Sequence, residues 1–387
     1  MNKRLKVLAV GDPAVYAYTD ERYSIIEGFE KGNEATVEFS IVPWDEYYGM
    51  MMDTFAGKHE FDIVMVAGHL WLKDFVQKGY LAEISAPETM EYDQEDILRV
   101  IADEMKIDGK TYLYPSFCDG HILLYRKSIV KESMGIELPE AVNTDTIFSI
   151  ARRCDGRQGM RGIAMKAAQS EIFTDFLPFL RNEGIDAFDE VTHAPVFNQE
   201  KGRIALEKYM ALKEYAPKNT HLYGNDEVRE SFQKKETALA VTWGGQLGAV
   251  LTDECLELED VGFSAIKTSW NVTWSFGINA KSENQELANQ FLAYVTSKNV
   301  DRIIGGYAGS PVRKSTYEKD SSQYPWYPVH LQLILKYAKP LPSMENAGEK
   351  TAPLYQAIHE AFTEKKSVAE ALDEAEDKIL QIDRRRS

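Results

Sequence analysis

The stretch that decides the fold class is Phe61-Asp62-Ile63-Val64-Met65-Val66-Ala67-Gly68, which is followed by an apolar-periodic run over 70–78 and by Gly79. The unbroken apolar run in its middle predicts a strand that is buried on both faces. The run after it has helical spacing, and a glycine at its end predicts where the helix stops. A buried strand that leads at once into a helix is typical of a parallel α/β sheet.

The same alternation of strand and helix runs upstream of this stretch. The sequence predicts strands over 6–10 and 37–41 and helices that begin at Asp20 and Trp44. The fold class is therefore α/β, with a doubly wound and mostly parallel sheet. Such sheets bind ligands beyond the carboxyl ends of their strands, so the segments after Val10 and Val66 are where we expect a site.

A second set of elements follows the hairpin that Asp108-Gly109 predicts. It comprises a strand over 238–241 and helices near 145–154, 171–183, 199–215 and 245–253. Two further strands are expected at 261–266 and 274–279, and the C-terminus is expected to be helical. A chain of 387 residues exceeds what one core comfortably fills, so we expect two domains.

Composition excludes several classes of function. The chain has 44 Lys plus Arg against 61 Asp plus Glu, a formal net charge of −17, which argues against nucleic-acid and anionic-membrane partners. No apolar run approaches the roughly 20 residues that cross a bilayer. The three cysteines have no metal-binding spacing and do not form a disulfide framework. No phosphate-loop, HExxH, GxSxG or EF-hand pattern is present.

The order of motifs resembles the extracellular solute-binding proteins of ABC importers, family 1, the group that includes maltose-binding and multiple-sugar-binding proteins. The segments that carry the resemblance are 61–64, 79–84, 108–115, 124–127, 277–282 and 310–315. The resemblance implies a type II periplasmic-binding-protein-like fold of two α/β lobes joined by a hinge of crossing segments. It implies lobes of 1–114 plus 261–314 and of 115–260 plus 315–387.

The family also implies a function and a location. We expect a non-catalytic monomer without cofactor or metal, which binds a mono- or oligosaccharide in the interlobe cleft and delivers it to ABC permease subunits by hinge closure. We expect an extracytoplasmic location, periplasmic or at the cell surface. The first predicted strand begins almost at Met1, so either a leader is missing from this sequence or the protein is a cytoplasmic relative that serves as a sugar sensor.

Sugar sites need aromatic planes for C–H faces and polar side chains for hydroxyl pairs. Trp243 follows a predicted strand and precedes Gly244, which allows close approach of the backbone to a ligand, and the family places a stacking aromatic there. Core packing is the alternative for Trp243. After the first strand, Asp12 is expected either to bind a hydroxyl or to form an Asx turn, and Tyr16 is expected near it.

Further candidates follow the next strand and the later chain segments. His69 and Trp71 lie in the second ligand loop, where His69 has a capping role as its alternative. Near the expected crossover, the resemblance implies a sugar-binding carboxylate at Asp119. His121 would share its face in an extended segment, and Phe117 is expected to be a platform or a packed side chain. The remaining candidates are Trp270 and Trp274, which are expected to line the cleft, and Arg313, which is expected to form a structural salt bridge or to contact the ligand.

Three alternatives remain open on the sequence alone. The acidic composition favours a polyamine or another small cation in the same fold. A carbohydrate-active enzyme would need a pair of carboxylates, which 61 acidic residues could supply in many ways. The third alternative is the cytoplasmic sugar sensor.

Overall fold

The computed structural model describes residues 3–384, apart from the side chain of residue 69. These residues form two compact units. The first unit comprises the chain up to Asp119 together with Val272–Pro328, and the second comprises Gly120–Asn271 together with the chain from Val329 onward. The backbone therefore passes from one unit to the other three times.

The first unit contains a mixed five-stranded sheet in the order β2-β1-β3-β12-β6. Its strands are β1 (Lys3–Val10), β2 (Ala35–Val42), β3 (Ile63–Ala67), β6 (Leu113–Asp119) and β12 (Val272–Ile278). Strand β1 is parallel to β2 and β3, as the sequence predicts, whereas β12 is antiparallel to β3 and β6. Strand β12 enters from the second unit, so no helical crossover constrains it to run parallel to β3.

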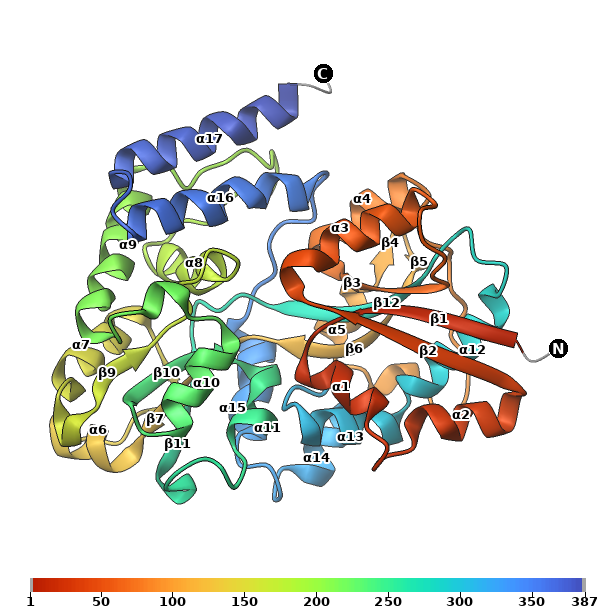
Figure 1. Cartoon of the computed structure of the whole chain (residues 1–387), viewed down its shortest axis with the longest axis horizontal. Coiled ribbons are helices and arrows are strands. Elements are labelled where there is room, and N and C mark those ends of the chain that lie inside the picture. The colour runs from red at the N-terminus through yellow and green to blue at the C-terminus, as the bar shows by residue number, and fades with distance from the viewer. Residues whose placement is uncertain (1–2, 385–387) are drawn as a thin grey trace. The chain divides into compact units, whose positions relative to one another are not determined.

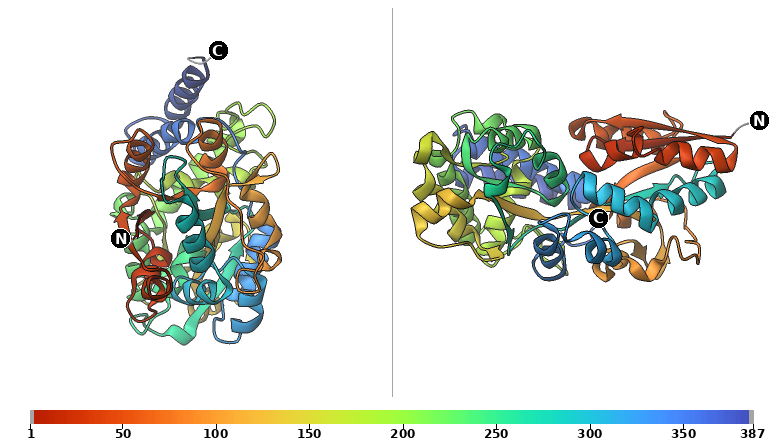
Figure 2. Two further views of the ribbon diagram at one scale, coloured as in Figure 1. Left: turned by 90° about the vertical axis from the view of Figure 1, so that its right-hand side faces the viewer. Right: turned by 90° about the horizontal axis from the view of Figure 1, so that it is seen from below.

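Helices cover both faces of this sheet (Figure 1). One face carries α3 (Trp44–Phe55) and α4 (Gly68–Gln77), and the other carries α1 (Pro13–Thr19), α2 (Ile25–Asn33), α12 (Gln285–Val295) and α13 (Lys298–Tyr307). In the right-hand view of Figure 2, red α2 and cyan α12 lie side by side although they are far apart in sequence. The rings of Phe29 and Phe291 meet there edge to face at 5.0 Å.

The other elements of the first unit are short. They are α5 (Arg99–Glu104), the hairpin of β4 (Lys106–Ile107) and β5 (Lys110–Thr111), and α14 (Lys314–Asp320). The predicted Asp108-Gly109 turn is confirmed. Both turn residues have positive φ, at 50° and 77°, which is the geometry that a two-residue hairpin requires.

The second unit has its own five-stranded sheet in the order β8-β11-β7-β10-β9. The strands are β7 (His121–Arg126), β8 (Ala141–Val142), β9 (Arg161–Ala164), β10 (Thr237–Trp243) and β11 (Val261–Ile266). Strand β10 is parallel to β9 and antiparallel to β7. Every residue of β10 is buried, so this strand lies in the core of the unit.

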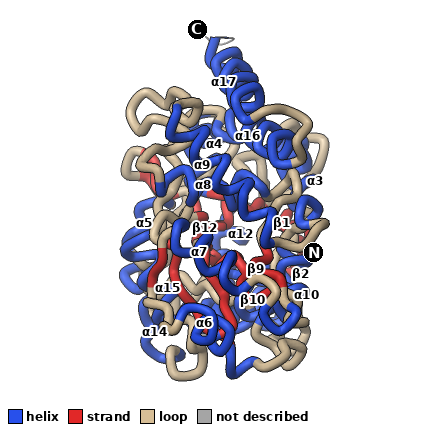
Figure 3. Tube along the Cα trace, turned by 90° about the vertical axis from the view of Figure 1, so that its left-hand side faces the viewer, coloured by secondary structure: helices blue, strands red, loops and turns tan. Residues whose placement is uncertain are grey.

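The helices of this unit are α6 (Lys127–Met134), α7 (Thr144–Cys154), α8 (Ile172–Asn182), α9 (Glu200–Ala211), α10 (Asn225–Gln233), α11 (Leu247–Val250), α16 (Ala347–Phe362) and α17 (Val368–Arg384). Helix α15 (Tyr327–Gln332) begins in the first unit and ends in the second. Figure 3 shows β9 and β10 in red with α7 and α10 beside them. The two C-terminal helices pack on each other and on α8 and α9.

The unit boundaries differ from the expected lobes in three places. From the sequence, residues 261–266 are expected in the first lobe, but β11 forms its hydrogen bonds with β7 and β8 of the second sheet. Conversely, residues 115–119 continue β6 and residues 315–328 include α14, and both segments belong to the first unit. Strand pairing between distant segments decides the membership of residues 115–119 and 261–266, and the pattern of a single strand does not reveal its partner.

Candidate functional site

The carboxyl ends of β1 and β3 define one edge of the first sheet. Because β12 and β6 are antiparallel to each other, the start of β12 and the end of β6 reach the same edge as the end of β3. Trp274 of β12 is paired with Ala67 of β3 on one side and with Phe117 of β6 on the other. The topology thus brings several of the predicted residues together at this edge.

Three tryptophans of the first unit form an aromatic group here, which we call the tryptophan cluster: Trp44, Trp71 and Trp274. Trp44 and Trp71 are stacked, with ring centroids 6.2 Å apart and an interplanar angle of 18°. Trp274 meets each of them edge to face at 5.8 Å. Trp44 is half-buried, whereas Trp71 and Trp274 are buried.

The tryptophan cluster carries one polar group whose bonding capacity is unused. The indole Nε1 of Trp71 is buried and has no hydrogen-bond partner among the residues that the structure describes. A buried indole N–H ordinarily finds an acceptor, and leaving one unmade costs about 1–3 kcal/mol. Proteins recognise a hydroxylated carbon skeleton by flat aromatic faces together with polar groups such as an unpaired N–H donor.

Phe117 lies beneath this cluster. Its ring is stacked near Trp274 at 6.5 Å and is fully buried, so it supports the tryptophan from the core side. Asp119 ends β6 opposite Val272 and is buried. The full burial of Phe117 agrees with a packing role for this side chain. Asp119 lies at the edge of the sheet where the sequence predicts it.

Asp12 and Tyr16 lie in the segment that follows β1. Asp12 caps α1, because its Oδ1 accepts a hydrogen bond of 2.9 Å from the backbone N–H of Ala14. Tyr16 is 49% exposed, whereas its neighbour Tyr18 is buried and its hydroxyl lies 2.7 Å from that of Ser116. Of the two tyrosines, only Tyr16 therefore has a face available to solvent.

Two further candidates of the first unit have different positions. His69 lies in the first turn of α4, and its side chain is outside the part that the structure describes. Arg313 is fully buried, and its guanidinium donates to the carbonyl oxygens of Thr296 and Asp93 at 2.6–3.1 Å. Asp96 lies 3.9 Å from it. This arrangement gives Arg313 a structural role within the first unit.

The second unit presents a corresponding edge, formed by the carboxyl ends of β9 and β10 and the start of the antiparallel β7. His121 and Trp243 are paired across β7 and β10, and their rings lie 4.1 Å apart at a tilt of 35°. Trp243 is 8% exposed. Trp270 packs 6.3 Å from Trp243 and is more deeply buried, among neighbours that include Phe173.

His121 is neutral at this edge. Its Nδ1 accepts a weak hydrogen bond of 3.4 Å from the backbone N–H of Trp270. Burial lowers the pKa of His121 well below its usual range, and the charges of Lys166 and Arg181 act in the same direction. The imidazole therefore provides a polar aromatic ring but no charge.

Gly244 follows Trp243, and its lack of a side chain serves packing within the second unit. A Cβ at this position would lie 2.4 Å from ring atoms of His330. From the sequence, this glycine is expected to allow close approach of a ligand. The structure shows that the space next to it holds the His330 ring.

A buried ion pair, which the sequence analysis did not identify, lies against Trp243. Lys166, just after the end of β9, is fully buried, and its Nζ lies 3.2 Å from Oδ1 of Asp175 on α8. The same ammonium lies over the Trp243 ring, 4.2 Å from the centroid. Burial raises the pKa of Asp175, and the Lys166 charge opposes that shift.

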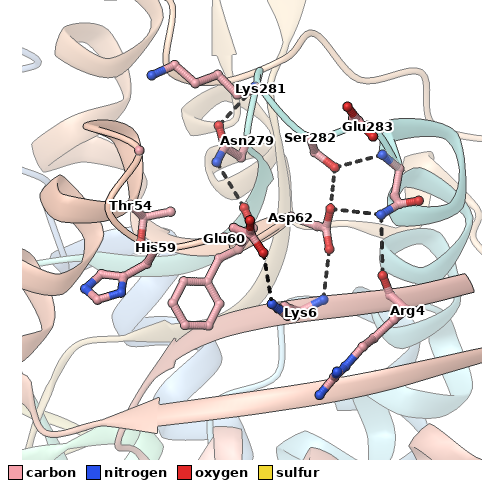
Figure 4. A pocket seen from close by; sticks show the side chains of 13 residues that line it. Arg4, Lys6, Thr54, His59, Glu60, Asp62, Asn279, Lys281, Ser282 and Glu283 are labelled. Atoms are coloured by element: carbon pink, nitrogen blue, oxygen red, sulfur yellow. Dashed lines mark hydrogen bonds and ion pairs between the residues drawn. The ribbon is translucent and has the colours of Figure 1, made fainter.

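The first unit also has a hollow of about 450 Å³ at the opposite edge of its sheet (Figure 4). It lies where β1 begins and β12 ends, and its lining includes Arg4, Lys6, His59, Asp62 and Asn284. Its charged groups are largely engaged with one another. Asp62, for example, accepts hydrogen bonds from the backbone of Lys6, from Ser282 and from Asn284 (Figure 4). The polar groups that line the hollow therefore bond mainly to one another, as structural groups do, and the hollow does not have the character of a solute site.

Comparison with known proteins gives the family. The family described as "Bacterial extracellular solute-binding protein" matches residues 14–300 of this chain. A relative from Sinorhizobium fredii is 22% identical over 382 residues, covering 94% of this chain and 86% of the relative. Its name is "Probable amino-acid ABC transporter periplasmic-binding protein y4oP".

Solved structures show the same fold. Maltose-bound MalE3 of T. maritima superposes with a TM-score of 0.87 at 20% identity, covering 98% of this chain and 99% of that one. A solute-binding protein of Agrobacterium vitis with bound D-mannitol superposes with a TM-score of 0.85 at 20% identity, covering 100% of this chain and 99% of that one.

These matches agree with the resemblance noted from the sequence. The fold is that of periplasmic binding proteins, and the family is one of binding proteins rather than enzymes. Among residues 3–384, no helix has both the length and the apolar character needed to span a membrane. Since the family match covers most of its length, this chain is a member of the bacterial extracellular solute-binding proteins that serve ABC transporters.

Proposed function

We propose that the solute is a sugar or polyol and that the tryptophan cluster is its principal platform in the first unit. The observation that carries the proposal is the buried, unpartnered Nε1–H of Trp71 beside the half-buried face of Trp44. Aromatic planes suit the C–H faces of a carbohydrate, and the N–H suits one of its hydroxyls. The maltose and mannitol complexes of the structural relatives support this class of solute.

The proposed mechanism is delivery to an ABC permease after hinge closure. A solute that takes contacts from residues of both units favours the conformer in which all those contacts form, and it shifts the population toward that conformer by its differential affinity. The expected signature in solution scattering is a smaller radius of gyration at saturating solute, with the protein remaining monomeric. An unchanged profile at saturation would contradict this mechanism.

The proposed location is outside the cytoplasm, as the family description indicates. Fractionation of the native cells, with the protein detected by antibody, tests this location. Recovery in the cytoplasmic fraction alone would favour the sensor alternative.

An amino acid is the second candidate solute, because the Sinorhizobium fredii relative is named as a probable amino-acid-binding protein of an ABC transporter. A thermal-shift screen of the full chain against maltose, D-mannitol, a set of amino acids and putrescine separates the candidates. A solute at 100 times its Kd stabilises the folded protein by about 2.7 kcal/mol. Shifts with amino acids alone would contradict the sugar proposal.

A further inference from the structure

The Lys166 ammonium occupies a position that a cationic solute would need. It lies 4.2 Å over the face of Trp243 and 3.2 Å from the carboxylate of Asp175, with no exposed surface. An aromatic face combined with a carboxylate is the usual protein site for an alkylammonium group. In this chain that site is filled by one of the protein's own side chains.

The geometry around Lys166 is fixed by the local backbone. The backbone N–H of Lys166 donates to Oδ2 of Asp175 at 2.8 Å, while its carbonyl accepts from the Tyr209 hydroxyl at 3.0 Å. Asp175 thus binds both the backbone N–H and the side-chain ammonium of Lys166. Because the residue is anchored at its backbone and at its ammonium, a competing amine would have to displace a pre-organised group.

The ammonium also has unused donor capacity. A lysine ammonium carries three N–H groups. Apart from the ion pair with Asp175, Nζ of Lys166 has no hydrogen-bond acceptor among the residues that the structure describes. Buried donors without acceptors are unfavourable. Because Nζ has no exposed surface, a solute oxygen reaches it only when the side chains around it move, and that oxygen would then pair a donor that otherwise has no acceptor.

We infer that Lys166 is a specificity-determining residue of the solute site, which admits solutes that present hydroxyl or carboxylate oxygens and rejects amines. This inference rests on the proposed function, because it assigns the solute contact in the second unit. Trp243 then acts through its ring, which holds the ammonium in place. Asp175 acts as a positioning residue for Lys166.

The experiment is calorimetric titration of the full chain and of Lys166→Ala with D-mannitol, D-gluconate and putrescine. The wild type should bind mannitol or gluconate and not putrescine. In Lys166→Ala the affinity should fall roughly 10- to 100-fold, as expected for loss of charge-assisted hydrogen bonds. A greater loss for gluconate than for mannitol would identify carboxylate as the preferred oxygen source, and the reverse would identify hydroxyl.

The difference between the gluconate and mannitol losses is the readout that a merely structural role would not move, and chemical rescue tests whether the amine site can be refilled. Propylammonium added to Lys166→Ala should refill the site between Trp243 and Asp175 and restore part of the lost affinity. The control is Lys350→Ala. Lys350 is another buried lysine of the second unit, paired with Asp383 at 2.6 Å, and its loss should leave affinity unchanged.

Two outcomes would overturn the inference: unchanged affinity in Lys166→Ala, or tighter binding of putrescine than of mannitol and gluconate by the wild type. If Lys166→Ala does not fold, the double variant Lys166→Gln/Asp175→Asn removes both charges and should lose affinity for the solute, mannitol or gluconate, that the wild type binds. Retention of wild-type affinity in that variant would also overturn the inference. Failure of the wild type to bind any hydroxylated solute would instead contradict the proposed function, while a propylammonium-induced thermal shift in Lys166→Ala alone would still support the filled amine site.

Discussion

Replacing Trp71 by Phe tests whether its buried N–H donates a hydrogen bond to the solute. The substitution keeps an aromatic ring in the cluster but removes Nε1, which has no partner among the described residues. The smaller ring costs about 1–2 kcal/mol of packing, and removing an unmet buried donor returns about 1–3 kcal/mol. The net change in the free energy of unfolding should therefore lie between a loss of about 1 kcal/mol and a gain of about 2 kcal/mol, while solute affinity falls by roughly 2- to 10-fold.

Trp326→Phe is the matched control. Its Nε1 is also buried but donates to the carbonyl oxygen of Gly309 at 2.9 Å, so the same substitution leaves that oxygen unpaired. Urea unfolding should show a loss of about 2–4 kcal/mol for Trp326→Phe, with unchanged solute affinity by calorimetry. Equal losses of stability in the two variants, with wild-type affinity in Trp71→Phe, would refute the role of Nε1 as a solute donor.

Three other substitutions test separate parts of the account. Trp243→Ala should weaken solute binding by roughly 2–4 kcal/mol in calorimetry, because it removes the ring that holds Lys166; a folded variant with normal Kd would show that Trp243 serves packing alone. Arg313→Met should cost about 3–5 kcal/mol of unfolding free energy, because the carbonyls of Thr296 and Asp93 lose their buried donor, and Kd should stay normal; lost affinity without lost stability would assign Arg313 to the solute instead. Burial raises the pKa of Asp301 to about 6, so wild-type stability should fall, relative to Asp301→Asn, as pH rises from 4 to 6, by at most about 3 kcal/mol; parallel pH curves in urea unfolding would contradict this.

The sign of the Asp301 effect follows from proton binding. Between the ordinary pKa of 3.8 and the raised value, the folded protein retains a proton that the unfolded chain has lost. Raising the pH therefore favours unfolding over this interval. Above pH 6 both states are ionised, and this contribution no longer changes.

Much of the fold could be predicted because its elements have strong local signals. The buried run of β3, the turn at Asp108-Gly109 and the helix of residues 172–182 follow from periodicity and turn chemistry. Membership of β11 in the second sheet could not be predicted, since it depends on hydrogen bonds to strands more than a hundred residues away.

The candidate site residues follow in part from the rule that ligands bind after strand ends. That rule identified Trp71 and Trp243, and applied to β2 and β9 it would also have pointed to Trp44 and Lys166. Asp175 carries no such signal, because it lies within a helix and reaches Lys166 only through tertiary packing. Arg313 has a charged side chain typical of a ligand contact, and only the structure shows its guanidinium bound to backbone carbonyls.

The most direct test of the proposed solute class is an equilibrium titration of the full chain with D-mannitol and maltose, monitored by intrinsic tryptophan emission. The proposal predicts a saturable change with one solute per chain for a hydroxylated solute, because the indoles of the tryptophan cluster change their surroundings on binding. It also predicts that Lys166→Ala shifts the midpoint to higher solute concentration. An emission that stays constant with sugars and polyols but saturates with an amino acid or putrescine would contradict it.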